Sequence, residues 1–530
     1  MSTTEELFGR YGPAYKWLGT CTVMLGTLSM TLATTIVNVA IPDIMGNFGI
    51  AQTKAQWFST GFLAAMAAFM LVSAWALQAF GMKAAYVGCL TIFMVASVVG
   101  GISPHENLVI LSRVVQGAMA GVIQPLAMTI IFQVFPERQR GLGMGIYRLG
   151  VILGPAIGPA VGGVLVDWLS WRAVFFMPLP TCLLAIGFAL FFAPGKNPGQ
   201  TTARFDWPGF IFLCLFLVSL LWGISNSQRL GWNSLTILAT GLLSVAAGLA
   251  FVIRELRTGH PLLNLSMLRV PGFAAGCAIS FCFGVGLFGS TYLIPLFVQQ
   301  IQSFTATAAG LLLMPAGLVM AMVFPLAGHM ADRFPAPLVI AMGTLMLALS
   351  SYMLGLMDVY TAPLVIIFWV ALGRLGLGFG MPAIGTGSLR VLDISLVSQG
   401  SGAANFSRQV GGALGVNLLS VTLERRTVEH ARVLNDTQTP ANALSSELLL
   451  RLQGLSQTAG LTPDQSVVAS MAYLRDAIQF QAYIKGFQDS FLILAGVFVF
   501  ALVPVWVMRV YTRHSKALSH HEYVETLSES

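Results

Sequence analysis

Runs of about 20 apolar residues follow one another through most of this 530-residue chain. That is the length at which an α-helix spans the hydrocarbon core of a bilayer, whereas a transmembrane β-barrel would show short alternating segments. Charged residues make up only 9% of the sequence, against about a quarter in soluble domains. We therefore predict an all-α integral membrane protein.

Fourteen apolar segments can be delimited. They lie at 17–41, 56–79, 84–102, 108–134, 142–167, 172–194, 207–226, 233–253, 272–298, 308–330, 338–357, 364–388, 401–423 and 487–511. The first begins near Leu18 and has no small-residue cleavage site after it, so we interpret it as a retained helix rather than a signal peptide. An even number of spans places both termini on one side of the membrane.

Basic residues indicate which side that is. If both termini are cytoplasmic, the short outer loops carry only three basic residues, Lys54, Arg172 and Arg229. The inner side then carries fifteen, namely Arg10, Lys16, Lys83, Arg138, Arg140, Lys196, Arg204, Arg254, Arg257, Arg269, Arg333, Arg390, Arg509, Arg513 and Lys516. The positive-inside rule thus predicts cytoplasmic termini. It also accounts for the net charge of +7 without nucleic-acid binding.

One long polar segment, 424–486, joins the last two spans on the predicted outer side. It contains two helix-like stretches, "ALSSELLLRLQGL" and "SVVASMAYLRDAIQFQAYI". It is either a solvated external hairpin or a functional element, which would be a docking surface for a partner or a lid over an outer opening. The six cysteines all fall in predicted spans, which favours buried small side chains over a disulfide framework.

Two internal similarities share one offset. "LSRVVQG" (111–117) recurs as "LGRLGLG" (372–378), which pairs Arg113 with Arg374, and "YRLGVILG" is echoed by "SRQVGGALG", which pairs Arg148 with Arg408. The offsets of 261 and 260 residues equal eight predicted spans, which indicates two six-helix bundles with two linking helices between them. The predicted units are a first bundle at 1–194, linking helices at 195–271, a second bundle at 272–511 and a cytoplasmic tail at 512–530.

Several motifs together carry a family resemblance. They are "RVVQG" in the fourth span, "GPAIGPAVGG" in the fifth, "GHMADR" after the tenth, and "TYLIPLFVQQIQSFTATAAGLLLMPAG" across the ninth and tenth. With them the chain resembles the major facilitator superfamily, in particular its fourteen-helix drug:proton antiporter branch of EmrB/QacA-type efflux pumps. The long segment before the last span resembles EmrB-type pumps in particular.

The resemblance implies a transporter rather than an enzyme. Its expected work is multidrug efflux of small amphipathic substrates across a bacterial inner membrane, by antiport with protons and with no other cofactor, and membrane lipid is an expected contact. In Gram-negative cells such pumps work with a periplasmic adaptor and an outer-membrane channel, and 424–486 is where adaptor contact is expected.

The fifth-span motif has a physical role. Gly154, Gly158 and Gly162 recur every four residues and so line one helix face, where small residues let another helix approach closely. Pro155 and Pro159 remove backbone donors and permit a bend. With Gly163, these residues predict a flexible, closely packed seam between the two halves, and plain tight packing is the alternative.

"GHMADR" supplies Gly328, Asp332 and Arg333, whose charges predict a latch at the inner end of the tenth span. Two solvated loop charges are the alternative. At the corresponding place in the first half, Ala74, Gln78 and Ala79 replace the family's glycine, aspartate and arginine. We therefore predict a weak or missing latch there.

The first span departs from the family at one position. The EmrB/QacA-type pattern has an aspartate where this chain has Ala33, although the neighbouring motif residues Leu32, Thr35 and Asn38 are kept. By our boundaries the spans hold four arginines and no carboxylate. The family's aspartate implies a proton carrier or a counter-charge for cationic drugs, and alanine is neither. We therefore expect anionic or neutral amphiphiles to be better substrates than cations, and proton coupling comes into question.

Because the spans hold no carboxylate, other side chains are the candidates for the substrate cavity. The polar, aromatic and basic side chains on inward faces are Thr34, Thr35, Asn38, Arg113, Gln116, Gln124, Tyr147, Arg148, Tyr292, Arg374, Asn405, Arg408 and Gln409. For the arginines, structural pairing is the alternative to anion contact. If protons drive transport, the carrier is the acid group of the substrate, an arginine-linked water network, or an interfacial carboxylate such as Asp43 or Asp167.

No histidine lies at mid-depth, and no metal-ligand spacing or phosphate-binding glycine loop occurs, so an ATP-driven pump and a metal site are unsupported. Two further readings stay open. One is an exporter of an endogenous anion such as a fatty acid, siderophore or phenolic metabolite. The other is an uncoupled membrane sensor or scaffold.

Overall fold

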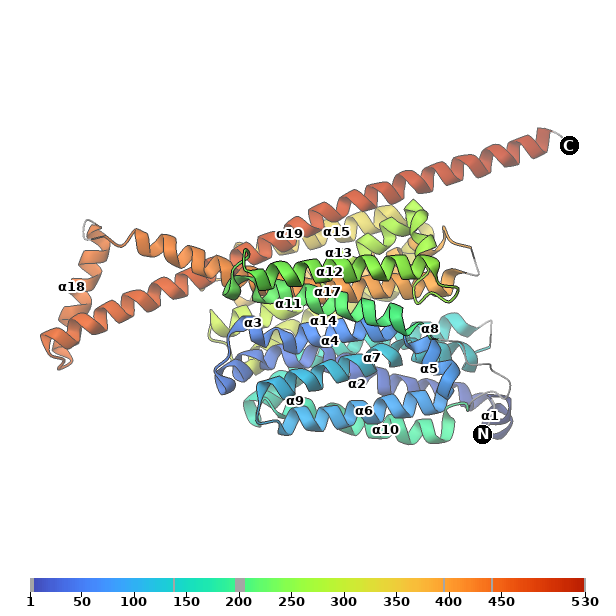
Figure 1. Cartoon of the computed structure of the whole chain (residues 1–530), viewed down its shortest axis with the longest axis horizontal. Coiled ribbons are helices and arrows are strands. Elements are labelled where there is room, and N and C mark those ends of the chain that lie inside the picture. The colour runs from blue at the N-terminus through green and yellow to red at the C-terminus, as the bar shows by residue number, and fades with distance from the viewer. Residues whose placement is uncertain (1–3, 137–138, 196–204, 394–395, 440–441, 529–530) are drawn as a thin grey trace.

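The computed structural model describes residues 4–136, 139–195, 205–393, 396–439 and 442–528 (Figure 1). Within these residues the regular structure is helical and no strand occurs. The α-helices are α1 (Thr4–Tyr11), α2 (Tyr15–Phe48), α3 (Gln52–Ala55), α4 (Trp57–Met70), α5 (Ser73–Phe80), α6 (Met82–Ile102), α7 (Glu106–Val134), α8 (Arg140–Trp168), α9 (Ala173–Phe176), α10 (Pro178–Phe192), α11 (Trp207–Leu230), α12 (Leu235–Arg257), α13 (Pro271–Gln300), α14 (Ala306–Arg333), α15 (Ala336–Leu354), α16 (Pro363–Leu389), α17 (Val397–Asp436), α18 (Ala443–Thr458) and α19 (Pro463–Ser528).

The long helices run side by side and form two groups, one above the other in Figure 1. In the first group α2 packs on α8, α7 and α10, and α7 packs on α4 and α6. In the second, α13 packs on α17 and α19, and α15 packs on α16 and α19. The linking helices α11 and α12 pair with each other. We call these groups the first and the second bundle.

The molecule has two distinct ends. Both chain termini lie at one end, which we call the terminal end, and residues 424–486 project from the other, which we call the hairpin end (Figure 1). This arrangement is what an even number of crossings requires. Which end faces the cytoplasm remains the prediction of the positive-inside rule.

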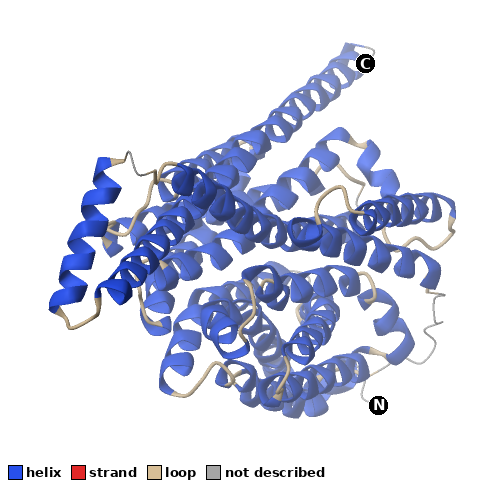
Figure 2. Ribbon diagram, turned by 60° about the vertical axis from the view of Figure 1, so that its left-hand side comes forward, coloured by secondary structure: helices blue, strands red, loops and turns tan. Residues whose placement is uncertain are grey.

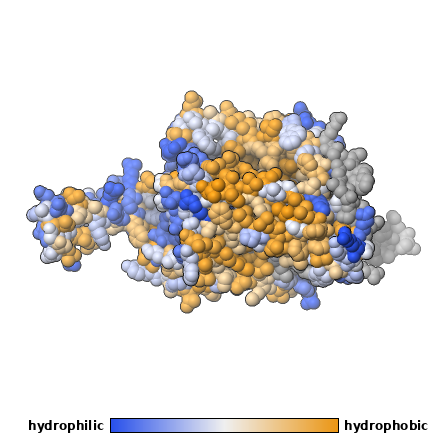
Figure 3. Space-filling model, turned by 90° about the horizontal axis from the view of Figure 1, so that it is seen from below, coloured by the Kyte–Doolittle hydropathy of each residue, from blue (hydrophilic) through white to orange (hydrophobic). Residues whose placement is uncertain are grey.

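Apolar side chains cover the middle of the helices, as the orange surface between bluer ends shows in Figure 3. Among the described residues, eleven helices are long and apolar enough to cross a membrane, or twelve if the bent pair formed by α3–α4 and α5 is one span. α8 and α17 lie among them without entering that count. The all-helical membrane fold is thus confirmed, and the number fourteen stays a prediction.

Two predicted spans are interrupted. Span 56–79 is two helices, α4 and α5, and a bend of 57° separates them at Leu71–Val72. Span 172–194 begins with the short helix α9 and continues as α10. Such breaks leave hydropathy unchanged, so the sequence pattern does not record them.

Glycines set the closest helix contacts. A Cβ on Gly117 of α7 would clash with the backbone carbonyl of Phe62 in α4. In the second bundle, Gly411 of α17 faces the carbonyl of Phe281 in α13, and Gly284 of α13 faces the carbonyl of Arg408. The "VVQG" and "VGG" motifs therefore let backbones touch, as small residues do in membrane helix pairs.

Residues 424–486 form a helical hairpin. α17 continues without a break past the predicted span to Asp436, α18 follows, and α19 returns from Pro463 into the bundle (Figures 1 and 2). Both helix-like stretches predicted in this segment are confirmed as helices. The structure supports the hairpin interpretation and leaves its function open.

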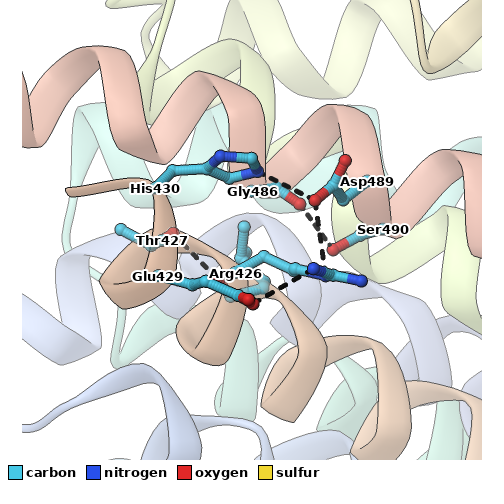
Figure 4. Close-up of polar contacts among 8 residues, drawn as sticks. Arg426, Thr427, Glu429, His430, Gly486, Asp489 and Ser490 are labelled. Atoms are coloured by element: carbon cyan, nitrogen blue, oxygen red, sulfur yellow. Dashed lines mark hydrogen bonds and ion pairs between the residues drawn. The ribbon is translucent and has the colours of Figure 1, made fainter. Parts of the chain in front are cut away.

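The base of the hairpin is held by a polar cluster, shown in Figure 4. Asp489 of α19 receives Arg426 Nε at 3.4 Å and His430 Nε2 at 2.9 Å, both from α17. Arg426 Nη1 also lies 3.0 Å from Glu429 Oε2. We call Arg426, His430 and Asp489 the hairpin root, because they tie the outgoing helix to the returning one.

Candidate functional site

The two bundles meet along three helix pairs. α8 packs on α14, α4 on α17, and α2 on α13. Backbones approach closely in the first pair: a Cβ on Gly163 would clash with the carbonyl of Ala306, and one on Gly310 with the carbonyl of Pro159. This seam is where the halves of an alternating-access transporter move against each other.

The glycine repeat of the fifth span does not lie in this seam, which corrects the prediction. Added Cβ atoms on Gly154, Gly158 and Gly162 would meet Thr31, Thr35 and Ile36 of α2, in the same bundle. The four-residue spacing does put them on one face, but that face points into the first bundle. Of the motif, Pro159 and Gly163 meet α14 from the adjacent face.

Thr291 and Tyr292 of α13 form a hub at the seam. The Thr291 carbonyl accepts from Asn38 Nδ2 of α2 at 3.4 Å, and the Thr291 hydroxyl accepts from Arg374 Nη2 of α16 at 2.7 Å. Asn38 in turn accepts from Ser59 Oγ at 2.5 Å. The structure thus brings together the predicted residues Asn38, Tyr292 and Arg374, which are all buried.

The short helix α3 is held from several sides at the hairpin end. Gln52 Nε2 donates to the Tyr292 hydroxyl at 3.3 Å, and the Tyr483 hydroxyl of α19 donates to Gln52 Oε1 at 2.9 Å. Ser225 of α11 donates to the Thr53 carbonyl at 3.2 Å and accepts from Gln56 Nε2 at 3.0 Å. We call this set of contacts around α3 the α3 clasp.

Hydrogen bonds between the bundles concentrate at one end. Among the described residues, they join Asn38 to Thr291, Gln52 to Tyr292 and Tyr483, Thr53 to Glu424, Val39 to Gln299, and Asp167 to Ala306 and Thr307. All of these pairs lie in the half of the helices toward the hairpin end. In this structure, hydrogen bonds therefore join the two bundles at the hairpin end.

Two arginines are buried in the bundles without a carboxylate partner among the described residues. Arg113 is 1% exposed; it donates to the Phe58 carbonyl and to Gln116, both at 2.9 Å, and its guanidinium lies 4.2 Å from the Phe62 ring centroid. Arg374 is 8% exposed and donates to Thr291. Each has one buried guanidinium nitrogen with no protein partner in the structure.

Ala33 is 2% exposed in α2 and packs in the apolar core. The family's aspartate would be buried at this position. The neighbouring side chains in sequence, Thr34 and Thr35, are buried as well. Thr34 is bonded to the Met30 carbonyl at 2.8 Å.

The other cavity candidates lie apart from the hub. Gln116 is in the first bundle with Arg113 and donates to Ser97, and Tyr147 donates to the Gln124 carbonyl at 3.2 Å. Asn405 and Arg408 are half-buried and Gln409 is buried in the terminal half of α17. The side chains of Arg148 and Asp332 lie outside the described residues. Gly328 has open space beside it and Arg333 is exposed, so the latch remains a prediction.

The two proposed proton carriers differ. Asp167 accepts from the backbone N–H groups of Ala306 at 3.2 Å and Thr307 at 2.7 Å, so it caps α14 across the seam. Asp43 is exposed at the hairpin end of α2. Neighbouring residues still shield part of its carboxyl group from water, and this desolvation, followed by the nearby Asp167 charge, raises the pKa of Asp43.

Two hollows lie in the described part of the structure. One of about 20 Å³ lies beside Arg374 within the second bundle and is lined by Ser290, Ser350 and Ser351 among others. The other, about 380 Å³, is an apolar groove where α11 and α12 meet Phe406 and Val410 of α17. The first has room for about one water molecule, which would satisfy the free nitrogen of Arg374.

Sequence reasoning missed Gln52, Thr291, Glu424 and Tyr483. Gln52 and Tyr483 lie in predicted loops, and Glu424 is the first residue after a predicted span. Thr291 is adjacent to the predicted Tyr292 in the "TYLIP" motif, which was a signal that could have identified it.

Comparisons with known proteins agree with this geometry. The model of the Major Facilitator Superfamily matches residues 23–416. The multidrug export protein EmrB of Escherichia coli (strain K12) is 26% identical over 495 residues, which are 92% of this chain and 94% of that protein. The colistin resistance protein EmrB of Acinetobacter baumannii is 25% identical over 515 residues, 96% of this chain and 99% of that protein.

Solved structures share the fold at low identity. A bacterial homologue of the human lysosomal transporter Spinster, in an inward-facing and occupied conformation, aligns with a TM-score of 0.60 at 16% identity and covers 94% of this chain and 97% of its own. A POT family transporter in complex with 5-aminolevulinic acid aligns with a TM-score of 0.64 at 14% identity, over 97% and 99%. This chain belongs to the Major Facilitator Superfamily and is a membrane transporter, not an enzyme, with EmrB multidrug export proteins among its relatives.

Proposed function

We propose that this transporter exports amphipathic organic compounds across a bacterial inner membrane by secondary active transport. Both termini would then be cytoplasmic and the hairpin would face the periplasm. The family match and the relatedness to EmrB multidrug export proteins support export. The arrangement of buried charge supports a preference for anionic or neutral compounds.

Two buried arginines, Arg113 and Arg374, support this preference for anionic or neutral compounds. Arg113 and Arg374 each keep one guanidinium nitrogen unpartnered, no described carboxylate pairs with either, and Ala33 fills the position of the family's aspartate. A buried positive charge without a counter-ion attracts anions and repels cations, because screening by water is weak there. An exporter of an endogenous anionic metabolite is the second candidate, because the same charges favour it.

Proton coupling is the expected energy source by family relationship. Without a span-1 carboxylate, the proton would be carried by the acid group of the substrate, by water bound to an arginine, or by a carboxylate at the hairpin end. Asp167 already accepts two backbone hydrogen bonds, and these stabilise its ionised form. Asp43 is exposed and has a hydrogen bond only with its own backbone among the described contacts, which favours it over Asp167 as a carrier.

The hairpin is the proposed contact for a periplasmic adaptor leading to an outer-membrane channel. Its helices expose large apolar side chains that the membrane would not cover, among them Leu444 at 80%, Leu450 at 68% and Val468 at 69%. Exposed apolar groups on a polar helix pair fit an amphipathic helical partner. If this proposal holds, pull-down of a periplasmic adaptor protein by the full-length transporter should fail with all three changed to serine.

Reconstituted proteoliposomes with a pH-sensitive dye inside test the transport proposal. After a pH gradient is imposed, one anionic, one neutral and one quaternary-ammonium amphiphile are added in turn, and liposomes without protein are the control. Proton movement driven by the anionic and neutral compounds supports coupled export. Substrate flux without proton movement contradicts coupling, and a response to the quaternary ammonium compound alone contradicts the substrate preference.

A further inference from the structure

Glu424 lies beside the α3 clasp and contacts Thr53 of α3. It lies in α17 directly after the predicted span 401–423 and is half-buried at the seam between the bundles. One carboxyl oxygen hydrogen-bonds to the Thr53 side chain of the first bundle. The other, Oε2, is buried and has no partner in the structure.

No cation compensates this carboxyl group among the described contacts. On α3, Lys54 is paired with Glu106 at 2.7 Å, and on α17 itself Arg426 is paired with Glu429 and Asp489. The titratable side chains that face Glu424 from the other elements are the hydroxyls of Tyr292 on α13 and Tyr483 on α19. Both are neutral near pH 7, and Gln52 and Thr53 of α3 carry no charge.

We propose that Glu424 is the proton-binding residue that controls the gate at the hairpin end, and that this gate closes with Glu424 protonated and opens when Glu424 ionises. This inference rests on the proposed function, for which it supplies a proton site in place of the span-1 aspartate. It assigns the site to the second bundle, at the opposite side of the seam from Asp43 and Asp167.

The physical argument follows from burial. In the closed seam Glu424 is shielded from water and lacks a counter-ion, so its ionised form is disfavoured. Burial raises the pKa of Glu424, and the hydrogen bond with Thr53 opposes this rise. In an open seam water reaches the carboxyl group, and its pKa returns toward the ordinary value near 4.5.

The sign of the pH dependence is therefore fixed. The closed state binds the proton more tightly than the open state, so low pH on the hairpin side favours closure. Between the two pKa values, the ratio of open to closed molecules rises about tenfold for each pH unit, because one proton is released on opening. A proton entering from an acidic periplasm would thus return the emptied transporter to the closed state.

The clasp also connects the gate to the hairpin. Tyr483 of α19 holds Gln52. The hairpin root fixes α19 to α17 through Asp489, which follows Tyr483 by six residues, and through Arg426 and His430, which follow Glu424 by two and six residues (Figure 4). Separation of α3 from Glu424 and Tyr483 therefore changes how the hairpin sits relative to the first bundle. Opening of the gate would therefore change the position of a partner bound to the hairpin relative to the first bundle.

Double electron–electron resonance distances test the proposal on the full-length protein. Spin labels are placed at His105→Cys and Tyr360→Cys, which are exposed at the hairpin end of the first and second bundles, with the exposed Cys21 changed to serine. Distances are recorded from pH 5 to pH 9 without substrate. In the otherwise unchanged protein, the longer, open distance should grow at least tenfold relative to the closed one as pH rises.

Glu424→Gln is the test variant, because glutamine keeps the size and the Thr53 contact but binds no proton. It should stay closed, with less than a twofold change across the pH range. Glu447→Gln is the matched control, since Glu447 is exposed on the hairpin and pairs with Arg451; it should behave as the parent protein does. Elution as a monodisperse peak in gel filtration verifies that each variant is folded.

A pH-independent parent protein overturns the proposal, and so does a Glu424→Gln variant that opens with rising pH as the parent does. The distance measurement needs no substrate, so its outcome is independent of the liposome assay. A pH-dependent gate in a protein that moves no substrate contradicts the export function alone. Proton-coupled export with a pH-independent gate contradicts the role of Glu424 alone.

Discussion

Asp167 of α8 accepts hydrogen bonds from the backbone N–H groups of Thr307, at 2.7 Å, and Ala306, at 3.2 Å, in the first turn of α14. A carboxylate of one bundle thereby caps a helix of the other. The Thr305 hydroxyl accepts from Ala308 N–H in the same turn at 3.2 Å. The N-terminal N–H groups of α14 are thus capped partly by Thr305 next to the helix and partly by Asp167 across the seam, and opening the hairpin end removes the hydrogen bonds to Asp167.

Asp167→Ala should shift the transporter toward opening at the hairpin end. Loss of a capping carboxylate costs about 1 kcal/mol, and this cost falls only on the closed state. The open fraction should rise about fivefold at fixed pH, as measured by the distance between labels at His105 and Tyr360. Glu447→Ala, which removes an exposed carboxylate on the hairpin away from the seam, should change it less than twofold; an equal effect of both would mean that only charge matters.

Gly163→Ala should disturb the same seam by steric means. Its added methyl group would meet the backbone of Ala306 and Thr307, which cannot move aside as a side chain could. Closure at the hairpin end should weaken, and transport in proteoliposomes should fall at least about tenfold, which corresponds to about 1.4 kcal/mol. Gly187→Ala is the control, because Gly187 of α10 has nothing within 4 Å. Full activity of Gly163→Ala would contradict the tight contact.

Hydropathy and helical spacing predicted the parts of this molecule that depend on local sequence. The helices, the common end of the two termini, the helical hairpin and the burial of Arg113 and Arg374 all follow from runs of apolar residues and from where charges interrupt them. The break between α4 and α5 could not be predicted in this way, since apolar residues continue through it.

The candidate site could not be predicted in full, because it is formed by contacts between segments that are far apart in the sequence. Tyr483 and Gln52 are 431 positions apart and meet only because α19 and α3 reach the same end of the seam. The spacing of Gly154, Gly158 and Gly162 predicted a shared face correctly, but periodicity does not say which neighbour that face meets. The sequence pattern predicts a loop at Glu424, because it follows the last apolar residue of a span, whereas α17 continues through it as one helix.

Arg374→Gln should reduce export of anionic substrates selectively. Loss of one charge about 8 Å from a bound anion removes about 2 kcal/mol of attraction at an effective dielectric constant near 20. Export of an anionic amphiphile should therefore fall at least tenfold relative to a neutral one in proteoliposomes. Arg451→Gln, on the exposed surface of the hairpin, should leave that ratio unchanged. An equal loss for both substrates would assign Arg374 a structural role through Thr291.

Asp489→Asn should loosen the hairpin without unfolding the bundles. Asp489 is the shared partner of Arg426 and His430 and is partly exposed, so its contacts are worth about 1 kcal/mol. Amide hydrogen exchange in residues 424–436 and 463–486 should become about fivefold faster, while α13 and α16 keep their protection. Glu447→Gln breaks a more exposed pair on α18 and should change exchange less than twofold. Unchanged exchange in Asp489→Asn would show that apolar packing alone holds the hairpin.

Glu255→Gln should stabilise the protein at high pH and not at low pH. Glu255 lies after the predicted span 233–253 and is 4% exposed; Oε2 accepts from Leu263 N–H at 2.9 Å, and Oε1 has no partner in the structure. Burial, and to a lesser extent the charge of Asp206, raise the pKa of Glu255. The folded protein therefore loses stability as pH rises from the unfolded pKa through the folded one, by about 1.4 kcal/mol per unit of difference.

Glutamine keeps the Leu263 bond and removes this loss, so the apparent Tm of Glu255→Gln in detergent should exceed that of the parent at pH 8 and equal it at pH 4.5. A uniform decrease at both pH values would mean that the ionised carboxylate itself is needed there.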